Sequence, residues 1–316
     1  FSYLKFSLSI VRPSFLKMPK RKVSSLDQRA ADYVSERMPM LGYGSYQVRG
    51  ESTLRPVIDM ALSAGYRFFD TAQIYRNESV LGRLFAELLP QHGLSREDIF
   101  YTSKVSPANQ GAGKAGKSVL KSLEQLQTGY IYLMLIHWPG SQRLRCENKE
   151  NRRLRTETYF ELEELIDEGK VRAIGVSNYE IRHLEELLDW CRILPAVNQC
   201  EFHPHFIINR ELIDFCKSSG IHFQAYSSLG GPDYVEALLG APEVKAVSKT
   251  HGTSPAVVLL AWAICQGHSV LPRSTRPERV AENIKALEVK LADDEVALLS
   301  SLPVSHRVCW NPETVA

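Results

Sequence analysis

The chain has 316 residues, of which 44% are hydrophobic, so it can bury a large core. Its formal net charge of +2 shows no general bias towards nucleic acid or membrane surfaces. The apolar runs are all shorter than the roughly 20 residues that span a bilayer. The six cysteines show neither CxxC nor metal-ligand spacing. We therefore expect reduced thiols, an intracellular protein, no metal, no nucleic-acid partner and no membrane partner.

The first 26 residues differ from the rest of the chain in charge. They contain no acidic residue and six basic ones: Lys5, Arg12, Lys17, Lys20, Arg21 and Lys22. A basic, serine-rich leader is typical of a mitochondrial transit peptide. The alternative, which we favour, is a mis-translated start with Met18 as the initiator. We expect residues 1–26 to be a disordered tail, residues 27–316 to form one domain, and the protein to be cytoplasmic unless the tail is a transit peptide.

From residue 40 onward, short apolar runs alternate with amphipathic stretches, which is typical of consecutive β–α units. The eight predicted strands are Met40–Tyr43, Tyr66–Phe69, Phe100–Val105, Ile131–Ile136, Ala173–Val176, Ala196–Gln199, His222–Tyr226 and Ser269–Pro272. Predicted helices include Thr53–Ala64, Lys114–Leu126 and Thr158–Glu168. A further helix is predicted to begin at Pro255, with the Ser254 hydroxyl as its cap. An open doubly wound sheet would need a glycine-rich phosphate loop, and the segment GYGSYQ lacks GxGxxG spacing. The sequence therefore predicts a closed (β/α)8 barrel.

Three of the predicted strands end in ionisable side chains. Asp70 follows the second strand, Lys104 lies near the end of the third, and His137 follows the fourth. Tyr75 comes five residues after Asp70. Each residue alone could cap a turn or pack on the surface. Because the carboxyl ends of parallel strands share one face of a barrel, we expect all four side chains to converge there.

Polar residues continue around the same predicted face. They follow or end the fifth, sixth and seventh strands: Ser177, Asn178, Gln199, Glu201, Tyr226, Ser227 and Ser228. Ordinary turns would account for one or two of these residues. Together they predict a polar rim of the kind on which barrel enzymes carry their chemistry.

The segment VLPRSTRPERVAEN predicts a strand end followed by a helix start. Thr275 and Glu278 have the spacing of a capping box, with Pro277 in the first turn. A helix N-terminus offers free N–H groups and partial positive charge to an anion. Arg273 and Arg279 add two guanidinium groups that suit phosphate oxygens. The alternative is a solvated basic helix start without a ligand.

The segments FFDTAQIYRNES, TSKV, YLMLIHWPG and VLPRSTRPERVAEN together resemble the aldo-keto reductases, a family of NADPH-dependent carbonyl reductases built on a (β/α)8 barrel. The resemblance extends from Met38 to the C-terminus. It implies the reduction of aldehydes and ketones to alcohols with NADPH/NADP+ as the cofactor. It also implies four catalytic residues: Asp70, Tyr75, Lys104 and His137.

These four residue types suit the chemistry of carbonyl reduction. Hydride transfer to a carbonyl carbon leaves negative charge on the oxygen, which needs a proton donor. A phenol with a pKa near 10 is a weak acid at neutral pH, and a neighbouring ammonium would lower that pKa. Tyr75 is therefore the expected general acid, and Lys104 with Asp70 is its tuning pair. His137 is expected to orient the carbonyl.

The resemblance implies a cofactor site spread over several strand ends. It assigns Ser177, Asn178 and Gln199 to the carboxamide, Tyr226 to a face of the nicotinamide ring, and Glu282 with Asn283 to the adenine. The full implied set is Gly44, Ser45, Asp70, Ser177, Asn178, Gln199, Tyr226, Ser227, Leu229, Arg273, Ser274, Thr275, Arg279, Glu282 and Asn283. Arg273 stands where the family has a lysine. This replacement keeps the positive charge that favours NADPH.

The substrate pocket is less clearly indicated. Tyr46, Val48 and Trp138 follow strand ends and are expected to form apolar walls with His137, although ordinary packing would explain each equally well. The tail after Leu302 is short, but we expect Trp310 within it to reach the mouth of the pocket. We expect a small-molecule carbonyl substrate and a monomer. Two alternatives stay open: a non-catalytic NADPH-binding or structural protein on the same fold, resembling channel β-subunits or crystallins, and a non-redox barrel such as an isomerase or aldolase.

Overall fold

The computed structural model describes residue 34 and residues 36–206, 210–303 and 307–316. The predicted basic tail, residues 1–26, lies outside these ranges, so it stays a prediction. No helix in the described ranges is long and apolar enough to cross a membrane.

Eight parallel strands form one curled sheet in sequence order. They are β1 (Tyr43–Gly44), β2 (Phe68–Asp70), β3 (Phe100–Val105), β4 (Ile131–Ile136), β5 (Val171–Ser177), β6 (Val197–Glu201), β7 (His222–Tyr226) and β8 (Ser269–Val270). A parallel bridge between Leu41 and Val270 joins the first edge to the last. The predicted (β/α)8 fold is confirmed. The observed first strand is shorter than the predicted one, because β1 pairs with β2 only at Tyr43 and Gly44.

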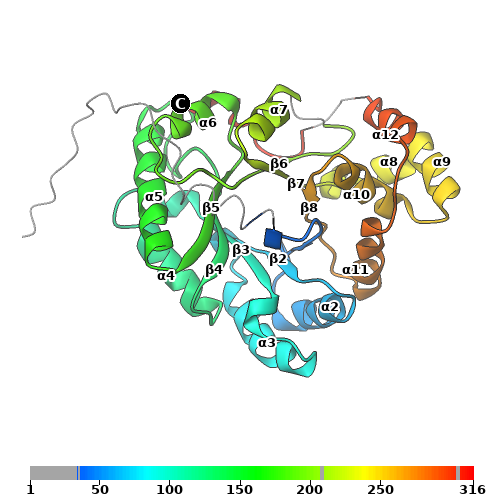
Figure 1. The fold of residues 1–316 in the computed structure, drawn as a ribbon, viewed down its shortest axis with the longest axis horizontal. Helices are drawn as coiled ribbons and strands as arrows, with labels where there is room; N and C mark the ends of the chain where they lie inside the picture. The colour runs from blue at the N-terminus through cyan, green and yellow to red at the C-terminus, as the bar shows by residue number, and fades with distance from the viewer. Residues whose placement is uncertain (1–33, 35, 207–209, 304–306) are drawn as a thin grey trace, which may run out of the picture.

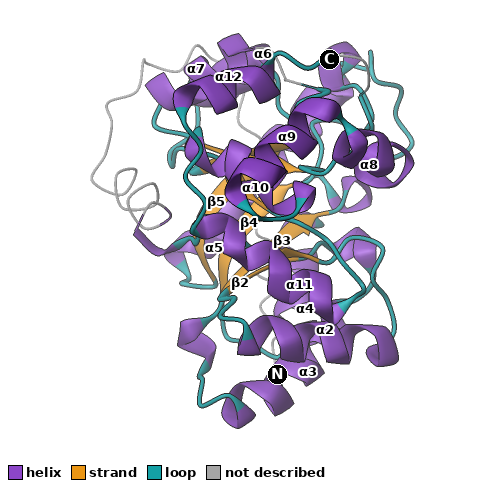
Figure 2. Cartoon of the chain, turned by 90° about the vertical axis from the view of Figure 1, so that its right-hand side faces the viewer, coloured by secondary structure: helices purple, strands orange, loops and turns teal. Residues whose placement is uncertain are grey.

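The helices surround the strands, which lie in the centre of the molecule (Figure 1 and Figure 2). They are α2 (Glu51–Ser63), α3 (Glu78–Gln91), α4 (Ala115–Gln125), α5 (Glu150–Asp167), α6 (Ile181–Leu188), α7 (Arg210–Ser218), α8 (Gly231–Gly240), α9 (Pro242–His251), α10 (Pro255–Cys265), α11 (Pro277–Asn283) and α12 (Asp293–Ser300). Short 3-10 turns are η1 (Gln73–Tyr75), η2 (Arg96–Asp98), η3 (Pro107–Asn109), η4 (Ile284–Leu287) and η5 (Pro312–Thr314).

Two predicted helix caps are wrong in detail. Helix α11 begins at Pro277, as a helix with proline in its first turn should, but its N-cap is Arg276 rather than Thr275. The residue before a proline is disfavoured in the helical conformation, and Arg276 is extended, so Thr275 lies one residue too early to cap. Likewise α10 begins at Pro255, but the Ser254 hydroxyl makes no capping hydrogen bond.

The inside of the barrel is divided into an apolar and a polar half. An inner apolar cluster includes Phe68, Phe100 and Leu133 from the amino-terminal halves of β2, β3 and β4. Asp70 and Lys104 are also buried, but they lie at the opposite, carboxyl-terminal ends of β2 and β3. The apolar half therefore supports a buried polar site at the face where the sequence predicts the chemistry.

Candidate active site

The Lys104 ammonium group is the centre of the site. It is fully buried, and its Nζ atom donates to Asp70 Oδ1 at 2.5 Å, to the Thr71 carbonyl oxygen at 3.0 Å and to the Tyr75 hydroxyl at 3.3 Å. An ammonium has three N–H donors, so these three acceptors satisfy it completely. Three of the four predicted catalytic residues are therefore in direct contact.

Tyr75 is placed by the short turn η1, which follows β2. Its ring is 7% exposed and meets the His137 ring edge-on, with 5.6 Å between centroids. The Tyr46 ring lies on another side, at 5.1 Å. The phenol hydroxyl thus contacts the Lys104 ammonium and the phenol ring packs against an imidazole, at the carboxyl ends of β2, β3 and β4.

The structure differs from the expected electrostatics of Tyr75. Burial raises the pKa of the Tyr75 phenol well above its usual value, and the nearby Asp70 carboxylate adds to this rise. The expected lowering by Lys104 does not prevail, because burial is the largest influence on the pKa of Tyr75 and acts in the opposite direction. Burial also lowers the pKa of Lys104 and raises that of Asp70, while the attraction between the two groups opposes both shifts. Tyr75 is therefore protonated at neutral pH.

His137 completes the predicted set as a neutral imidazole. Burial, together with the Lys104 charge, lowers the pKa of His137 to about 3. Its Nδ1 atom is buried and has no hydrogen-bond partner among the described residues. A neutral imidazole beside the Tyr75 ring can hold a carbonyl oxygen through a hydrogen bond without adding a charge.

A chain of amides continues from Asp70 across the barrel. Gln199 Nε2 donates to Asp70 Oδ2 at 2.9 Å and to Gln224 Oε1 at 2.6 Å, and Gln224 Nε2 donates to Ser269 Oγ at 3.0 Å. Gln224 was not among the residues predicted from the sequence. Its position as a polar residue inside the buried strand HFQAY was the available signal. This network fixes the carboxylate that holds Lys104.

Asn77 has a similar supporting role that the sequence analysis did not predict. Its side-chain nitrogen donates to the carbonyl oxygens of Ser45 and Val48 at 3.0 and 2.9 Å, and its oxygen accepts from the Thr71 hydroxyl at 2.6 Å. The Ser45 hydroxyl in turn donates to the Asp70 carbonyl oxygen at 2.8 Å. Asn77 therefore ties the loop after β1 to the loop that carries Tyr75.

Comparison with known proteins agrees with this geometry. A family model described as "Aldo/keto reductase family" matches residues 40–303. The chain is 36% identical over 276 residues to a glyoxal reductase of Bacillus subtilis, covering 87% of this chain and 93% of the relative. It is 37% identical over 279 residues to a 9,11-endoperoxide prostaglandin H2 reductase of Trypanosoma cruzi, covering 88% and 93%. The chain belongs to the aldo-keto reductase family.

Solved structures of the family superpose on this aldo-keto reductase over most of its length. An aldo-keto reductase from a Medee basin deep-sea metagenome library aligns with a TM-score of 0.79 and 31% identity, covering 88% of this chain and 96% of that one. The aldose reductase of Schistosoma japonicum aligns with a TM-score of 0.76 and 32% identity, covering 86% and 90%. Family membership and relatives named as reductases indicate an oxidoreductase.

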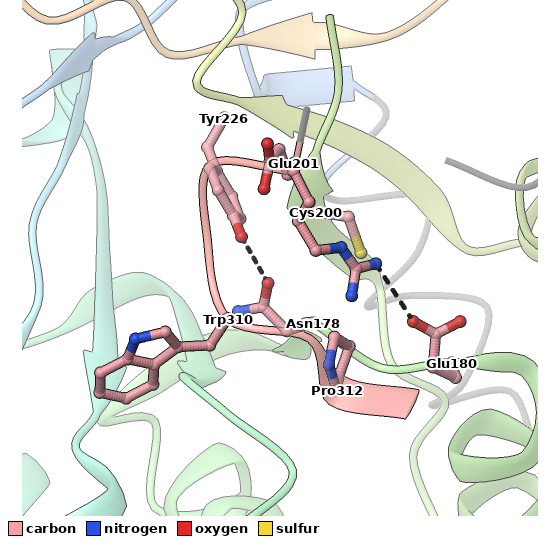
Figure 3. Close-up of a pocket in the computed structure, with 8 residues that line it drawn as sticks. Asn178, Glu180, Cys200, Glu201, Tyr226, Trp310 and Pro312 are labelled. Atoms are coloured by element: carbon pink, nitrogen blue, oxygen red, sulfur yellow. Dashed lines mark hydrogen bonds and ion pairs between the residues drawn. The ribbon is translucent and has the colours of Figure 1, made fainter. Parts of the chain in front are cut away.

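Several residues that the resemblance assigns to the cofactor meet beside the predicted catalytic residues of this aldo-keto reductase. The Asn178 side-chain nitrogen donates to the Ser177 hydroxyl and to the His137 carbonyl oxygen, both at 3.0 Å. Its oxygen accepts from the Tyr226 hydroxyl at 2.6 Å (Figure 3). The Ser177 hydroxyl donates to the Gln199 carbonyl oxygen at 2.8 Å. These polar side chains thus line one continuous edge from β4 to β7.

The remaining predicted cofactor residues lie on two loops and at α11. Gly44 lets β1 approach the chain beyond β8, because a Cβ there would lie 2.7 Å from the Leu271 carbonyl oxygen. Arg273 and Arg279 are both exposed near the start of α11. Among the others, Thr275 is exposed and Asn283 is buried. The half-buried ones are Ser227, Leu229, Ser274 and Glu282. The Arg273 guanidinium donates to Gln47 Oε1 at 3.4 Å.

The predicted substrate walls have different environments. Tyr46 is 53% exposed and packs against Tyr75, while Trp138 meets the 79%-exposed Trp310 edge-on at 6.1 Å. Val48 is 1% exposed and belongs to the main hydrophobic core, so the structure gives it a packing role. Tyr46 and Trp310 are therefore exposed aromatic side chains, and Trp138 packs against Trp310.

Proposed function

We propose that this aldo-keto reductase reduces aldehydes and ketones to alcohols with NADPH. The observation that supports the proposal most is the contact of one buried ammonium, Lys104, with both Asp70 and Tyr75. A protonated phenol beside a neutral imidazole provides a proton donor and a second hydrogen-bonding group for one carbonyl oxygen.

The roles of the residues follow from their contacts. NADPH, when bound, supplies the hydride that the carbonyl carbon accepts. His137 orients the carbonyl oxygen, and Tyr75 gives that oxygen its proton. As the proton leaves, the Lys104 ammonium stabilises the phenolate at 3.3 Å, and Asp70 keeps Lys104 in place. Proton transfer through a buried, positioned group of this kind commonly contributes ~10²–10⁴-fold to the rate.

The cofactor assignment is part of the same proposal. Ser177, Asn178 and Gln199 present hydroxyl and amide groups beside the catalytic residues, which suits a carboxamide. Arg273 and Arg279 are exposed guanidinium groups, which suit a phosphate and favour NADPH over NADH. No ion pair of either guanidinium is seen within the described ranges, so both charges are free to bind a ligand.

The test is a substrate panel with purified protein. We expect NADPH to be consumed with aldehydes, ketones, quinones and sugars at different rates, and the relative named glyoxal reductase makes small dicarbonyls a useful addition. Binding of NADPH without turnover of any carbonyl compound would instead support a non-catalytic role. Failure to bind NADPH at all would contradict the proposal.

A further inference from the structure

One buried side chain joins two loops beside the candidate active site. Gln110 follows η3 in the loop between β3 and α4 and is 1% exposed. Its Nε2 atom donates to the carbonyl oxygens of Trp138 at 2.6 Å and Gly140 at 3.2 Å. Both carbonyl groups lie in the loop that begins after β4, immediately beyond His137. These two hydrogen bonds, here called the Gln110 clamp, therefore hold residues 138–140 from a neighbouring loop.

The partners of Gln110 determine how its amide group is oriented. Carbonyl oxygens can only accept hydrogen bonds, so the amide nitrogen faces them and uses both of its N–H groups. The Gln110 Oε1 atom is buried and has no hydrogen-bond partner among the described residues. A buried acceptor without a partner costs free energy, so the favourable contribution of this amide lies in the clamp.

The clamp acts on the backbone that supports the Trp138 indole. A Cβ atom added to Gly140 would lie 3.2 Å from Trp138 Nε1 and 3.3 Å from Trp138 Cδ1. One edge of the indole therefore lies directly on the backbone of the glycine whose carbonyl group Gln110 binds. A shift of that backbone moves the surface on which the indole packs.

The chain on either side of the clamp is held by other contacts. Before it, the His137 N–H group donates to the Val105 carbonyl oxygen at 3.2 Å. After it, the Gln142 N–H group and the Ser141 hydroxyl donate to the Pro107 carbonyl oxygen at 3.0 and 3.1 Å. Loss of the clamp should therefore loosen the residues between these contacts and leave the imidazole in place.

The loop that carries Gln110 is itself attached to the turn that carries Tyr75. Gln73 lies in η1, two positions before Tyr75. Its Oε1 atom accepts from the Ser106 N–H group at 3.0 Å and from Asn109 Nδ2 at 2.8 Å. A continuous set of hydrogen bonds thus links the turn of the proposed proton donor, the Gln110 loop and the indole platform.

We propose that Gln110 is a positioning residue that sets substrate specificity. By fixing the Trp138 indole relative to Tyr75, it favours carbonyl compounds with a planar apolar group that packs on the indole. The inference rests on the proposed function, because it takes Trp138 as a wall of the substrate pocket. A wall that is already ordered loses less entropy when a substrate packs on it. Loss of the clamp should therefore weaken the binding of aromatic aldehydes more than that of small ones.

The first experiment measures KM and kcat for benzaldehyde and propanal with NADPH. Gln110→Met has a similar length and no N–H donor, so it removes the clamp with little change in volume. We expect KM for benzaldehyde to rise about tenfold and KM for propanal to rise less than about threefold. Because His137 is held separately, kcat should change less than about threefold for both substrates. Gln110→Asn is too short to reach both carbonyl oxygens and should act in the same direction.

Tyr159→Phe is the matched control, because it also removes a buried side-chain hydrogen bond to a backbone carbonyl oxygen. The Tyr159 hydroxyl on α5 donates to the Ile193 carbonyl oxygen at 2.9 Å. A general effect of lost stability will appear in this control as well. Equal changes in KM for the two aldehydes, or a fall in kcat alone, would overturn the specificity role of Gln110.

A double-mutant cycle tests whether Gln110 acts through the indole. Trp138→Ala should itself raise KM for benzaldehyde. If the clamp works by placing the indole, Gln110→Met should then add no further increase in the Trp138→Ala background. Additive effects of the two substitutions would overturn this route.

The last experiment observes the clamp without turnover, by ¹⁹F NMR of protein labelled with 5-fluorotryptophan. The Trp138 signal is identified by its loss in Trp138→Phe. In Gln110→Met this signal should shift or broaden, while those of Trp190 and Trp262 keep their positions. An unchanged Trp138 signal would overturn the clamp and leave the proposed function intact. Absence of carbonyl reduction by the unmutated protein would instead contradict the proposed function, and the specificity role with it.

Discussion

The Lys104 ammonium lies 3.3 Å from the Tyr75 hydroxyl, and both groups are almost completely buried. Burial raises the pKa of the phenol, so Tyr75 is protonated at neutral pH. The contact with Lys104 then matters most after the proton has left, when the phenolate needs a cation nearby. In the proposed reaction, Tyr75 therefore donates the proton and Lys104 stabilises the phenolate that remains.

The first prediction concerns the proton donor. Tyr75→Phe should lower kcat for carbonyl reduction by ~10²–10⁴-fold, because the phenol is the only proposed acid. The dissociation constant of NADPH should stay within about threefold. Steady-state kinetics and cofactor titration check the two parts separately. Tyr130→Phe removes a hydroxyl at the other end of the barrel and serves as the control. A Tyr75→Phe enzyme that keeps more than a tenth of the activity of the unmutated protein would contradict the assignment.

The second prediction concerns cofactor selection. Arg279→Ala should weaken NADPH binding by roughly 10–100-fold, since one charge-assisted phosphate contact is worth about 1.5–3 kcal/mol. NADH binding should change little, so the preference between the two cofactors should fall. Lys285→Ala, an exposed cation on η4, is the control for general charge effects. Equal affinity of the unmutated protein for NADH and NADPH would rule out the role of Arg273 and Arg279.

The third prediction concerns the basic stretch between Ser141 and Thr156. The sequence suggests that its arginines overhang the pocket mouth and attract anionic ligands. In the structure Arg153 pairs with Glu150 and Glu157 on α5, and Arg155 is 4% exposed and pairs with Glu186 at 2.7 Å. Arg152 also lies 3.3 Å from Glu186. These pairs largely balance the three charges.

The basic residues left for such attraction lie before α5. No ion pair of Arg143, Arg145 or Lys149 is seen in the part of the chain that the structure describes, and all three are exposed. Neutralising these three should lower kcat/KM for a carboxylate-bearing aldehyde relative to its neutral analogue at low salt, and less so at high salt. Neutralising Arg152, Arg153 and Arg155 is the control. If the ratio of kcat/KM values for the charged and neutral aldehydes does not change with salt concentration, the hypothesis is wrong.

The fourth prediction concerns stability in acid. Burial lowers the pKa of His222 to about 4 in the folded protein, whereas an unfolded histidine has a pKa of about 6.5. Between these values the unfolded chain binds a proton that the folded one does not, so the free energy of unfolding falls as pH falls. The contribution is full above the unfolded pKa and is lost as pH drops through about 4.

The variant His222→Gln tests this effect. Glutamine can keep the hydrogen bond that joins the His222 ring to Ser269 at 2.9 Å, but it does not titrate. Its free energy of unfolding should depend less on pH between 6 and 4.5, by up to about 1.4 kcal/mol per pH unit. Denaturant titrations at several pH values measure the slopes. Identical slopes for the two proteins would show that His222 is not buried as a neutral group.

Local pattern was enough to predict the fold and the positions of Asp70, Lys104 and His137 at or near strand ends. The strands β3, β4 and β7 match their predicted bounds, because each is a short apolar run with clear punctuation. Helix α5 begins at Glu150, well before the predicted Thr158, because its first two turns are charged and carry little apolar periodicity. The rule that disfavours helix before proline was available in the sequence and would have corrected the cap of α11.

The sequence by itself determined which strands end in Asp70, Lys104 and His137, since strand order and side-chain type are written along the chain. Only the tertiary structure decided the state of those groups: the protonated Tyr75, the low pKa of His137 and the pairing of Asp70 with Gln199 all depend on burial and on distant neighbours. The contact of Glu201 with Val308 spans 107 positions of sequence. Such contacts form only after the barrel closes and brings the strand ends and residues 307–316 to one face, which no local period encodes.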